Sequence, residues 1–119
     1  MPNTPQLIAE YSLGADNALL LTVTIGDAQL GVSAVWIDDR LFDKGDFTRR
    51  PIGLGKELFD SQLRIKSLVS DVNAATNHTS VTYILEGGPS VRKDILQQEV
   101  ANNGDSVIYR SIYALLKTT

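Results

Sequence analysis

The stretch LFDSQLRIKSLVSDVNAATNHTSVTYIL, residues 58–85, decides the fold of this chain. In its first half, positions that are apolar or small alternate with polar or charged ones: Leu63, Ile65, Ser67 and Val69 against Gln62, Arg64 and Lys66. Its last part repeats the alternation: Val81, Tyr83 and Leu85 against Ser80, Thr82 and Glu86. A period of two is typical of a strand that buries one face. The stretch therefore predicts two half-buried strands.

The interval between the two runs, residues 72–80, is rich in Asn, Ala and Thr, which is the composition of a tight connection. We therefore interpret the two runs as an antiparallel pair with one face on the core. Sliding the first strand by one residue would bury Arg64 and Lys66 without partners, at a cost on the order of several kcal/mol each. The register of this pair is expected to be well fixed.

The rest of the chain shows the same alternation between turn residues, and it predicts strands over 6–13, 18–25, 29–37 and 106–116, with a weaker strand over 52–56. Gly26-Asp27 predicts a hairpin between the second and third strands, and Asn103-Gly104-Asp105 predicts another before the last strand. Three of these strands are apolar enough to be central: 18–25, 29–37 and 106–116. We expect Arg110 to lie near an end or rim of the last one.

Two segments have weaker patterns. The run Leu41-Phe42 lies between Asp-rich turns, which predicts a short hairpin followed by a loop through residues 48–51. Residues 90–101 fit either a strand or a short helix, and we favour a strand because the flanking elements are strands.

These segments predict an all-β fold, an antiparallel two-sheet β-sandwich of about seven to nine strands, of immunoglobulin-like, C2-like or jelly-roll type. The sandwich can include one short helix near residues 91–101, and a closed barrel is the alternative architecture. A chain of 119 residues is of single-domain size. We expect a flexible lead-in over residues 1–5 and one sandwich domain over residues 6–119.

Composition and charge argue against several classes of protein. The chain has a net charge of −3, which disfavours a nucleic-acid binder, and its longest apolar run is far too short to span a membrane. No signal peptide is visible, so we expect a soluble domain and leave its compartment open. Residues 1–39 carry a net charge of −5 and residues 40–119 a net charge of +2. This asymmetry suggests an acidic surface that meets a basic one on a partner or a second copy.

No catalytic constellation is found, and we expect neither an enzyme nor a cofactor. His78 is the single histidine, the chain has no cysteine, and no Gly-x-Ser-x-Gly elbow is present. The segment Gly53-Leu54-Gly55-Lys56 differs from a phosphate-binding loop, because Glu57 stands where that loop needs Ser or Thr.

Two groups of side chains are weak candidates for a binding site. The first is a set of aspartates that offers oxygen ligands to calcium: Asp38, Asp39, Asp43 and Asp46. The second is a set of aromatic residues that suggests a platform for a sugar ring: Trp36, Tyr109 and Tyr113. Both sets also fit simpler roles, turn formation for the aspartates and core packing for the aromatic residues.

The sequence therefore favours a non-catalytic protein interaction or assembly domain, for instance part of a bacterial surface or secretion apparatus, which binds a protein partner or associates with itself. The motivating positions are polar and uncharged, and they lack the lysines that normally guard an exposed sheet: Thr22, Thr24, Gly31 and Ser33. The alternative is a sandwich module that binds carbohydrate or another small ligand, with or without calcium.

Overall fold

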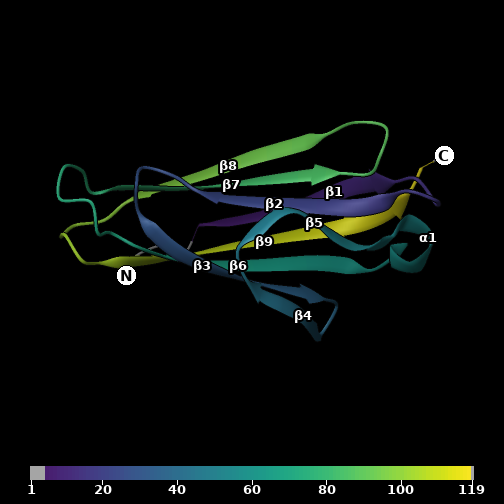
Figure 1. Ribbon diagram of the computed structural model, residues 1–119, viewed down its shortest axis with the longest axis horizontal. Coiled ribbons are helices and arrows are strands. Elements are labelled where there is room, and N and C mark those ends of the chain that lie inside the picture. Colours follow the sequence, from purple (N-terminus) through teal and green to yellow (C-terminus); the bar gives the residue numbers. More distant parts are fainter. Residues whose placement is uncertain (1–4, 119) are drawn as a thin grey trace.

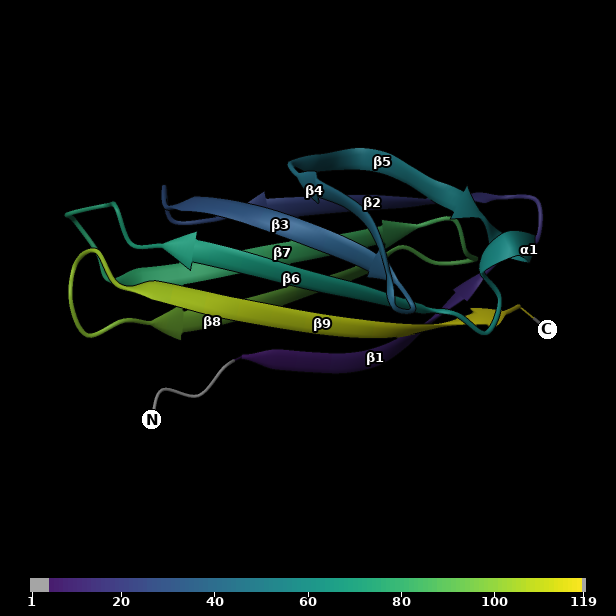
Figure 2. The same ribbon diagram turned by 90° about the horizontal axis from the view of Figure 1, so that it is seen from below.

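The computed structural model describes residues 5–118, which form two β-sheets packed face to face in a body of 46 × 25 × 22 Å (Figure 1). Within this range the strands are β1 (Gln6–Leu13), β2 (Ala18–Ile25), β3 (Leu30–Ile37), β4 (Arg40–Gly45), β5 (Phe47–Leu54), β6 (Gln62–Ser70), β7 (His78–Glu86), β8 (Arg92–Glu99) and β9 (Ser106–Lys117). A short helix, α1 (Gly55–Leu58), precedes β6. Sheet A has the order β1-β9-β6-β3-β4, and sheet B has the order β5-β2-β7-β8 (Figure 2).

The predicted all-β sandwich is confirmed. Residues 90–101 contain the strand β8 and no helix, so the preference for a strand there is confirmed as well. The helical turn is α1 instead, where the Glu57 carboxylate accepts a hydrogen bond from the Leu54 N–H at 3.2 Å. This contact satisfies an N–H that the helix itself leaves unpaired.

The core fills the space between the sheets with alternate side chains of both. The inward positions of β6 and β7 include Leu63, Ile65, Val69, Val81, Tyr83 and Leu85, each at most 2% exposed. Burial of one such side chain stabilises the fold by roughly 1.5–3 kcal/mol. Arg64 and Lys66 lie on the solvent side of β6, so the predicted faces of both strands are confirmed.

Hydroxyl groups link the two sheets within this core. Ser67 Oγ of sheet A lies 2.7 Å from Ser33 Oγ and 2.9 Å from the Tyr83 hydroxyl of sheet B. Burial is the main cause that raises the pKa of Tyr83 to about 12, and the hydrogen bond from Ser67 opposes it. The hydroxyls are therefore paired where they leave water, as buried polar groups must be.

The antiparallel pair expected between β6 and β7 is wrong. β6 lies between β9 and β3 in sheet A, whereas β7 lies between β2 and β8 in sheet B, so the connection after β6 crosses from one sheet to the other. The two predicted hairpins, β2 to β3 and β8 to β9, are wrong for the same reason. A period of two determines which face a strand buries, but it does not determine which strand lies beside it.

Residues 48–51, expected as a loop, belong to β5, and the weak strand expected over residues 52–56 is divided between β5 and α1. β5 is an edge strand of sheet B, so one side of its backbone has no neighbouring strand. Pro51 lacks an N–H and is tolerated in such a strand, because no ladder hydrogen bond is lost on the unpaired side. The pairing with β2 shifts register beside the Leu20–Pro51 pair.

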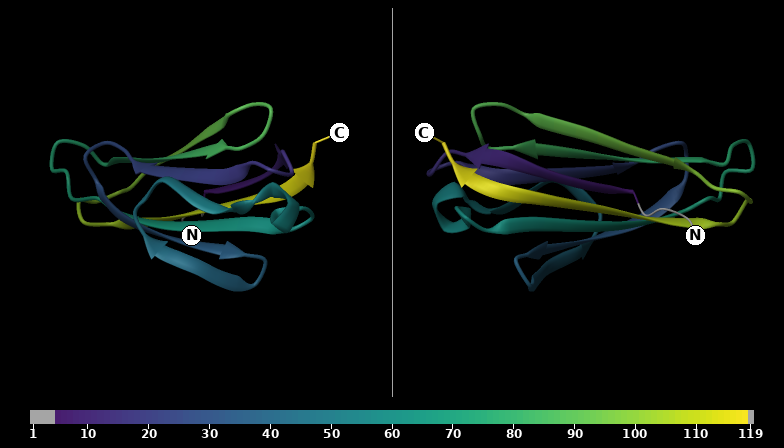
Figure 3. Two further views of the ribbon diagram at one scale, coloured as in Figure 1. Left: turned by 45° about the vertical axis from the view of Figure 1, so that its right-hand side comes forward. Right: turned by 180° about the vertical axis from the view of Figure 1, so that it is seen from behind.

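β1 and β9 run parallel, unlike the other strand pairs within residues 5–118, and Figure 3 shows them side by side in purple and yellow. β9 lies between β1 and β6, which confirms its central position. The sequence suggested that Arg110 lies near an end or rim of β9, and this expectation is wrong. Arg110 is an exposed residue in the interior of the strand, between Gln6 of β1 and Lys66 of β6, because the outer face of sheet A is open to solvent.

Candidate interaction surface

The three aromatic candidates do not form one platform. Tyr109 and Tyr113 are fully buried, and the Tyr113 hydroxyl donates to the Asp94 carboxylate at 2.7 Å. Burial, and then the hydrogen bond to Asp94, raise the pKa of Tyr113 above its ordinary range. Trp36 instead lies partly exposed on the outer face of sheet A. The tyrosines therefore belong to the core, and Trp36 alone among the three is accessible to a ligand.

The four aspartates proposed for calcium are spread over the turn between β3 and β4, over β4 itself and over the position between β4 and β5: Asp38, Asp39, Asp43 and Asp46. The Asp38 carboxylate accepts a hydrogen bond from the Gln62 N–H at 2.9 Å, and Asp39 lies 3.5 Å from the Arg64 guanidinium. Within residues 5–118 no three metal-ligating side chains gather in one place. The structure thus does not bring this set together.

Asp43 shows what these carboxylates do. One of its oxygens accepts the Lys44 N–H at 2.7 Å, and the other lies 2.9 Å from the Arg50 guanidinium. The backbone hydrogen bond from Lys44, followed by the one from Arg50, lowers the pKa of Asp43 below its ordinary value. The carboxylate is stabilised as an anion by the protein's own donors.

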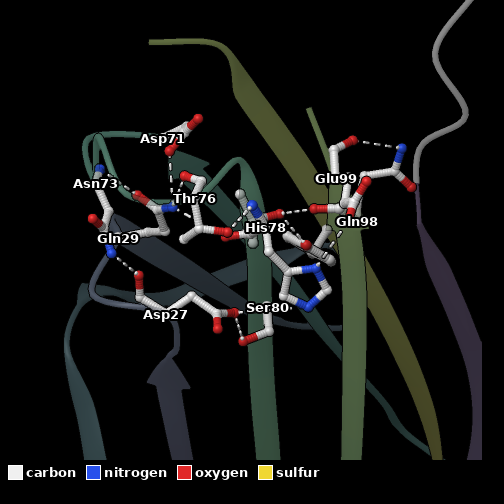
Figure 4. Close-up of polar contacts among 11 residues, drawn as sticks. Asp27, Gln29, Asp71, Asn73, Thr76, His78, Ser80, Gln98 and Glu99 are labelled. Carbon is white, nitrogen blue, oxygen red and sulfur yellow. Dashed lines mark hydrogen bonds and ion pairs between the residues drawn. The ribbon is translucent and has the colours of Figure 1, made fainter. Parts of the chain in front are cut away.

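A polar cluster at the end where β6 connects to β7 is organised by Gln29 (Figure 4). Its buried carboxamide donates to Asp71 Oδ1 at 2.8 Å and to the His78 carbonyl at 3.0 Å. Its oxygen accepts the N–H groups of Val72 and Asn73 at 2.8 and 2.9 Å. Gln29 therefore fastens the connection between the two sheets to the start of β3, which is a structural role.

His78 lies beside this cluster, with Asp27 Oδ2 3.9 Å from its Nε2 and Glu99 Oε1 4.0 Å from its Nδ1 (Figure 4). Ser80 Oγ donates to Asp27 Oδ2 at 2.8 Å. Serine catalysis needs the hydroxyl to be hydrogen-bonded to the imidazole that takes its proton. Here the serine is bonded to the carboxylate, so the three residues are not arranged as a catalytic triad.

The outer face of sheet A, called the A face below, is built of three rows of side chains that cross β3, β6 and β9. The first, the apolar row, consists of Val32, Leu68 and Ile108. The second, the cationic row, consists of Ala34, Lys66 and Arg110. The third, the tryptophan row, consists of Trp36, Arg64 and Ile112. Successive rows are two residues apart along each strand, which is about 7 Å.

The apolar row and its surroundings leave large side chains in water. Of the eight large apolar side chains that are exposed within residues 5–118, five lie on the A face: Ile8, Leu30, Val32, Leu41 and Leu68. Leu30 is 66% exposed, Val32 50% and Leu68 41%, and they neighbour one another on β3 and β6. Single exposed apolar residues are ordinary, whereas a joined group of them is less usual on the surface of a monomer.

The cationic and tryptophan rows border a hollow of about 410 Å³ in the same face. Its lining contains three cations and one carboxylate, a net charge of +2: Arg64, Lys66, Arg110 and Asp39. The Asp39–Arg64 pair is the ion pair of this group, at 3.5 Å between two exposed side chains. Within residues 5–118, Lys66 and Arg110 form no ion pair.

The outer face of sheet B, called the B face, is different. Its rows across β2, β7 and β8 are Thr24, Thr82 and Ile95, and Thr22, Ile84 and Lys93. Two of the four residues that suggested an uncharged outer surface, Thr22 and Thr24, lie here. The other two are corrected, because Ser33 is buried at 4% exposure and Gly31 lies on the same inward face of β3.

The sequence contained the residues of the A face but not their juxtaposition. The alternation in β6 already placed Arg64 and Lys66 on its solvent side. Lys66 lies opposite Arg110, and Leu68 opposite Val32, because β6 pairs with β9 and β3. The sequence had instead predicted hairpins that pair β3 with β2 and β9 with β8.

Comparisons with known proteins found no family model, no curated protein and no solved structure that matches this chain. Within residues 5–118, no helix has the length and apolar character needed to cross a membrane.

Proposed function

We propose that this chain is a non-catalytic interaction domain that binds a protein partner through the A face. The observation that carries the proposal is the apolar row with Leu30, a joined apolar group on three adjacent strands that is not needed for the core. Protein–protein interfaces have such an apolar centre surrounded by polar groups.

The charge of the A face indicates the chemistry of the partner. The cationic row lies directly beside the apolar row, and the hollow next to it has a net charge of +2. A complementary surface therefore presents apolar side chains with carboxylates beside them. A partner with a basic surface is disfavoured, since like charges across an interface oppose binding.

The test compares substitutions on the two outer faces. Val32→Lys combined with Leu68→Lys places two charges in the apolar row, whereas Ile95→Lys places one at a residue of the B face that is 52% exposed. We expect a protein captured from the source cell to be retained by the wild type and by Ile95→Lys, and to bind the double variant at least about tenfold more weakly. Calorimetric titration of that purified protein into each variant measures the difference in affinity.

Two results would contradict this proposal. Equal affinity of the double variant and the wild type would remove the A face as the binding surface. Concentration-dependent dimerisation in sedimentation velocity, lost in the double variant, would replace the acidic partner by a second copy of the chain. Circular dichroism of each variant checks that the sandwich is intact.

Binding of a small ligand is the second candidate function, supported by the position of Trp36 beside the hollow. An exposed indole face can stack on a sugar ring, and the lining polar groups can bond its hydroxyls. The calcium variant of this role has less support, since the four aspartates are not gathered.

A further inference from the structure

Lys66 and Arg110 occupy directly opposite positions on the neighbouring strands β6 and β9. Two like charges at opposite positions destabilise a sheet, because the side chains project from the same face at close distance. The flanking positions of this row are Ala34 and Gln6, which bring no negative charge. The sheet thus keeps a repulsive pair at the centre of its open face.

The surroundings of this pair are hollowed and positively charged. The guanidinium of Arg64 adds a third cation, and Asp39 offsets only one of the three charges in the hollow. Trp36 forms part of the lining, next to Arg64 in the tryptophan row. A volume of about 410 Å³ is enough for one or two side chains of a partner.

We propose that the hollow is the receptor for a carboxylate side chain carried by an extended acidic segment of the partner. This inference rests on the proposed interaction function and specifies its partner. A guanidinium binds a carboxylate through two parallel hydrogen bonds, and a neighbouring ammonium adds a third donor. A carboxylate above Lys66 and Arg110 also relieves the repulsion between them.

The spacing of the rows indicates the sequence pattern of that segment. In an extended chain, side chains on one face recur about every 7 Å, which is also the separation of successive rows on the A face. A segment that runs along β6 thus places one apolar residue over the apolar row, an acidic residue over the cationic row, and a second apolar residue over the tryptophan row, where Trp36 and Ile112 flank Arg64. The pattern is apolar-x-acidic-x-apolar.

This pattern favours a peptide segment over a small anion. A single sugar acid or phosphate bound in the hollow leaves the apolar row, with Val32 50% exposed, in water. The extended segment covers both features with one backbone. Free anions and sugar acids are therefore competing occupants that the experiment must separate.

The chain contains one tryptophan, Trp36, and it lies in the hollow, so indole fluorescence reports on this site directly. The probe is the capped peptide Leu-Thr-Glu-Thr-Leu, and its matched control is Leu-Thr-Gln-Thr-Leu. We expect the Glu peptide to change the fluorescence saturably and to bind about tenfold more tightly than the Gln peptide. The difference decreases as salt is added, because the groups are exposed to solvent.

Charge-neutralising variants test which residues cause the discrimination. We expect Lys66→Gln combined with Arg110→Gln to bind the Glu and Gln peptides equally. Lys93→Gln removes a positive charge from the B face, and it should keep the roughly tenfold preference. A role of Lys66 and Arg110 in folding alone would not change this ratio, so the ratio separates binding from stability.

Three outcomes overturn the inference: equal binding of both peptides to the wild type, a preference that survives in the double variant, or binding of inorganic phosphate or glucuronate with higher affinity than the Glu peptide. The proposed function fails separately. A partner that fails to bind the double variant Val32→Lys with Leu68→Lys can still bind the double variant Lys66→Gln with Arg110→Gln. That result would support an A-face interface without a carboxylate receptor.

Discussion

Sheets A and B bury similar side chains but expose different ones. Leu63 in sheet A and Leu85 in sheet B are fully buried, and hydroxyls of both sheets bond one another in the core. Outside, the B face carries threonines and isoleucines, whereas the A face carries an apolar row next to a repulsive pair of cations. The inward faces satisfy the requirements of folding. The A face keeps two features that folding alone disfavours, and these two features support the proposed binding role.

The difference between inward and outward positions predicts the largest effect on stability. Leu63→Ala opens a cavity in the core, and we expect it to lower the free energy of unfolding by about 2–5 kcal/mol. Leu68→Ala, on the same strand but 41% exposed, should change it by less than about 1 kcal/mol. Urea unfolding of the two variants measures both values.

Similar losses in the two variants would contradict the division of β6 into a core face and a face that is free for the proposed binding. Leu68 would then belong to the fold, and the apolar row would no longer need a partner to explain it. A combined variant checks this result, since effects on opposite faces of one strand should be additive when the residues share no contact.

The sequence predicted the faces of the strands better than their neighbours. The alternation in residues 58–85 placed Leu63 and Tyr83 inside and Lys66 outside, because the period of a strand is a local property. It could not show that Ser67 bonds Tyr83 across the core instead of lying in the same sheet. That contact depends on a sheet-to-sheet crossing held by Gln29, whose five hydrogen bonds join residues far apart in the chain.

The candidate site was predicted less well for the same reason. Trp36 was a sequence candidate and lies in the hollow, but it was grouped with Tyr109 and Tyr113, which are buried. Lys66 and Arg110 were each visible as charges on strands. Their direct opposition follows from strand order, which one sequence without pairing information does not contain.

The burial of the Tyr83 hydroxyl between the two sheets predicts a loss of stability at alkaline pH. The pKa of Tyr83 is about 12 in the folded protein against 10.0 as its ordinary value. The folded state therefore retains this proton when the unfolded chain has released it. This group therefore leaves the free energy of unfolding unchanged below pH 10 and lowers it as the pH rises to about 12. The total decrease is on the order of 2–3 kcal/mol.

The matched control for this prediction is Tyr83→Phe, which removes the titrating group but retains the ring. We expect the free energy of unfolding, measured by urea at a series of pH values, to fall less steeply above pH 10 in the variant than in the wild type. Parallel curves would show that Tyr83 does not couple proton binding to the packing of the sheets.

The smallest effect concerns the repulsive pair on the A face. Lys66→Gln removes one of two opposed charges, so we expect the free energy of unfolding to rise by about 0.2–0.5 kcal/mol at low salt and to return to the wild-type value at high salt. Lys93→Gln on the B face has no cation opposite it, since its partner in β7 is Ile84, and it should leave stability unchanged. Differential urea unfolding at two salt concentrations resolves the comparison.

A loss of stability in Lys66→Gln would mean that the cation supports the sheet. A gain in stability, joined to a weaker preference for the Glu peptide, would show that the A face keeps this charge for binding at the expense of folding.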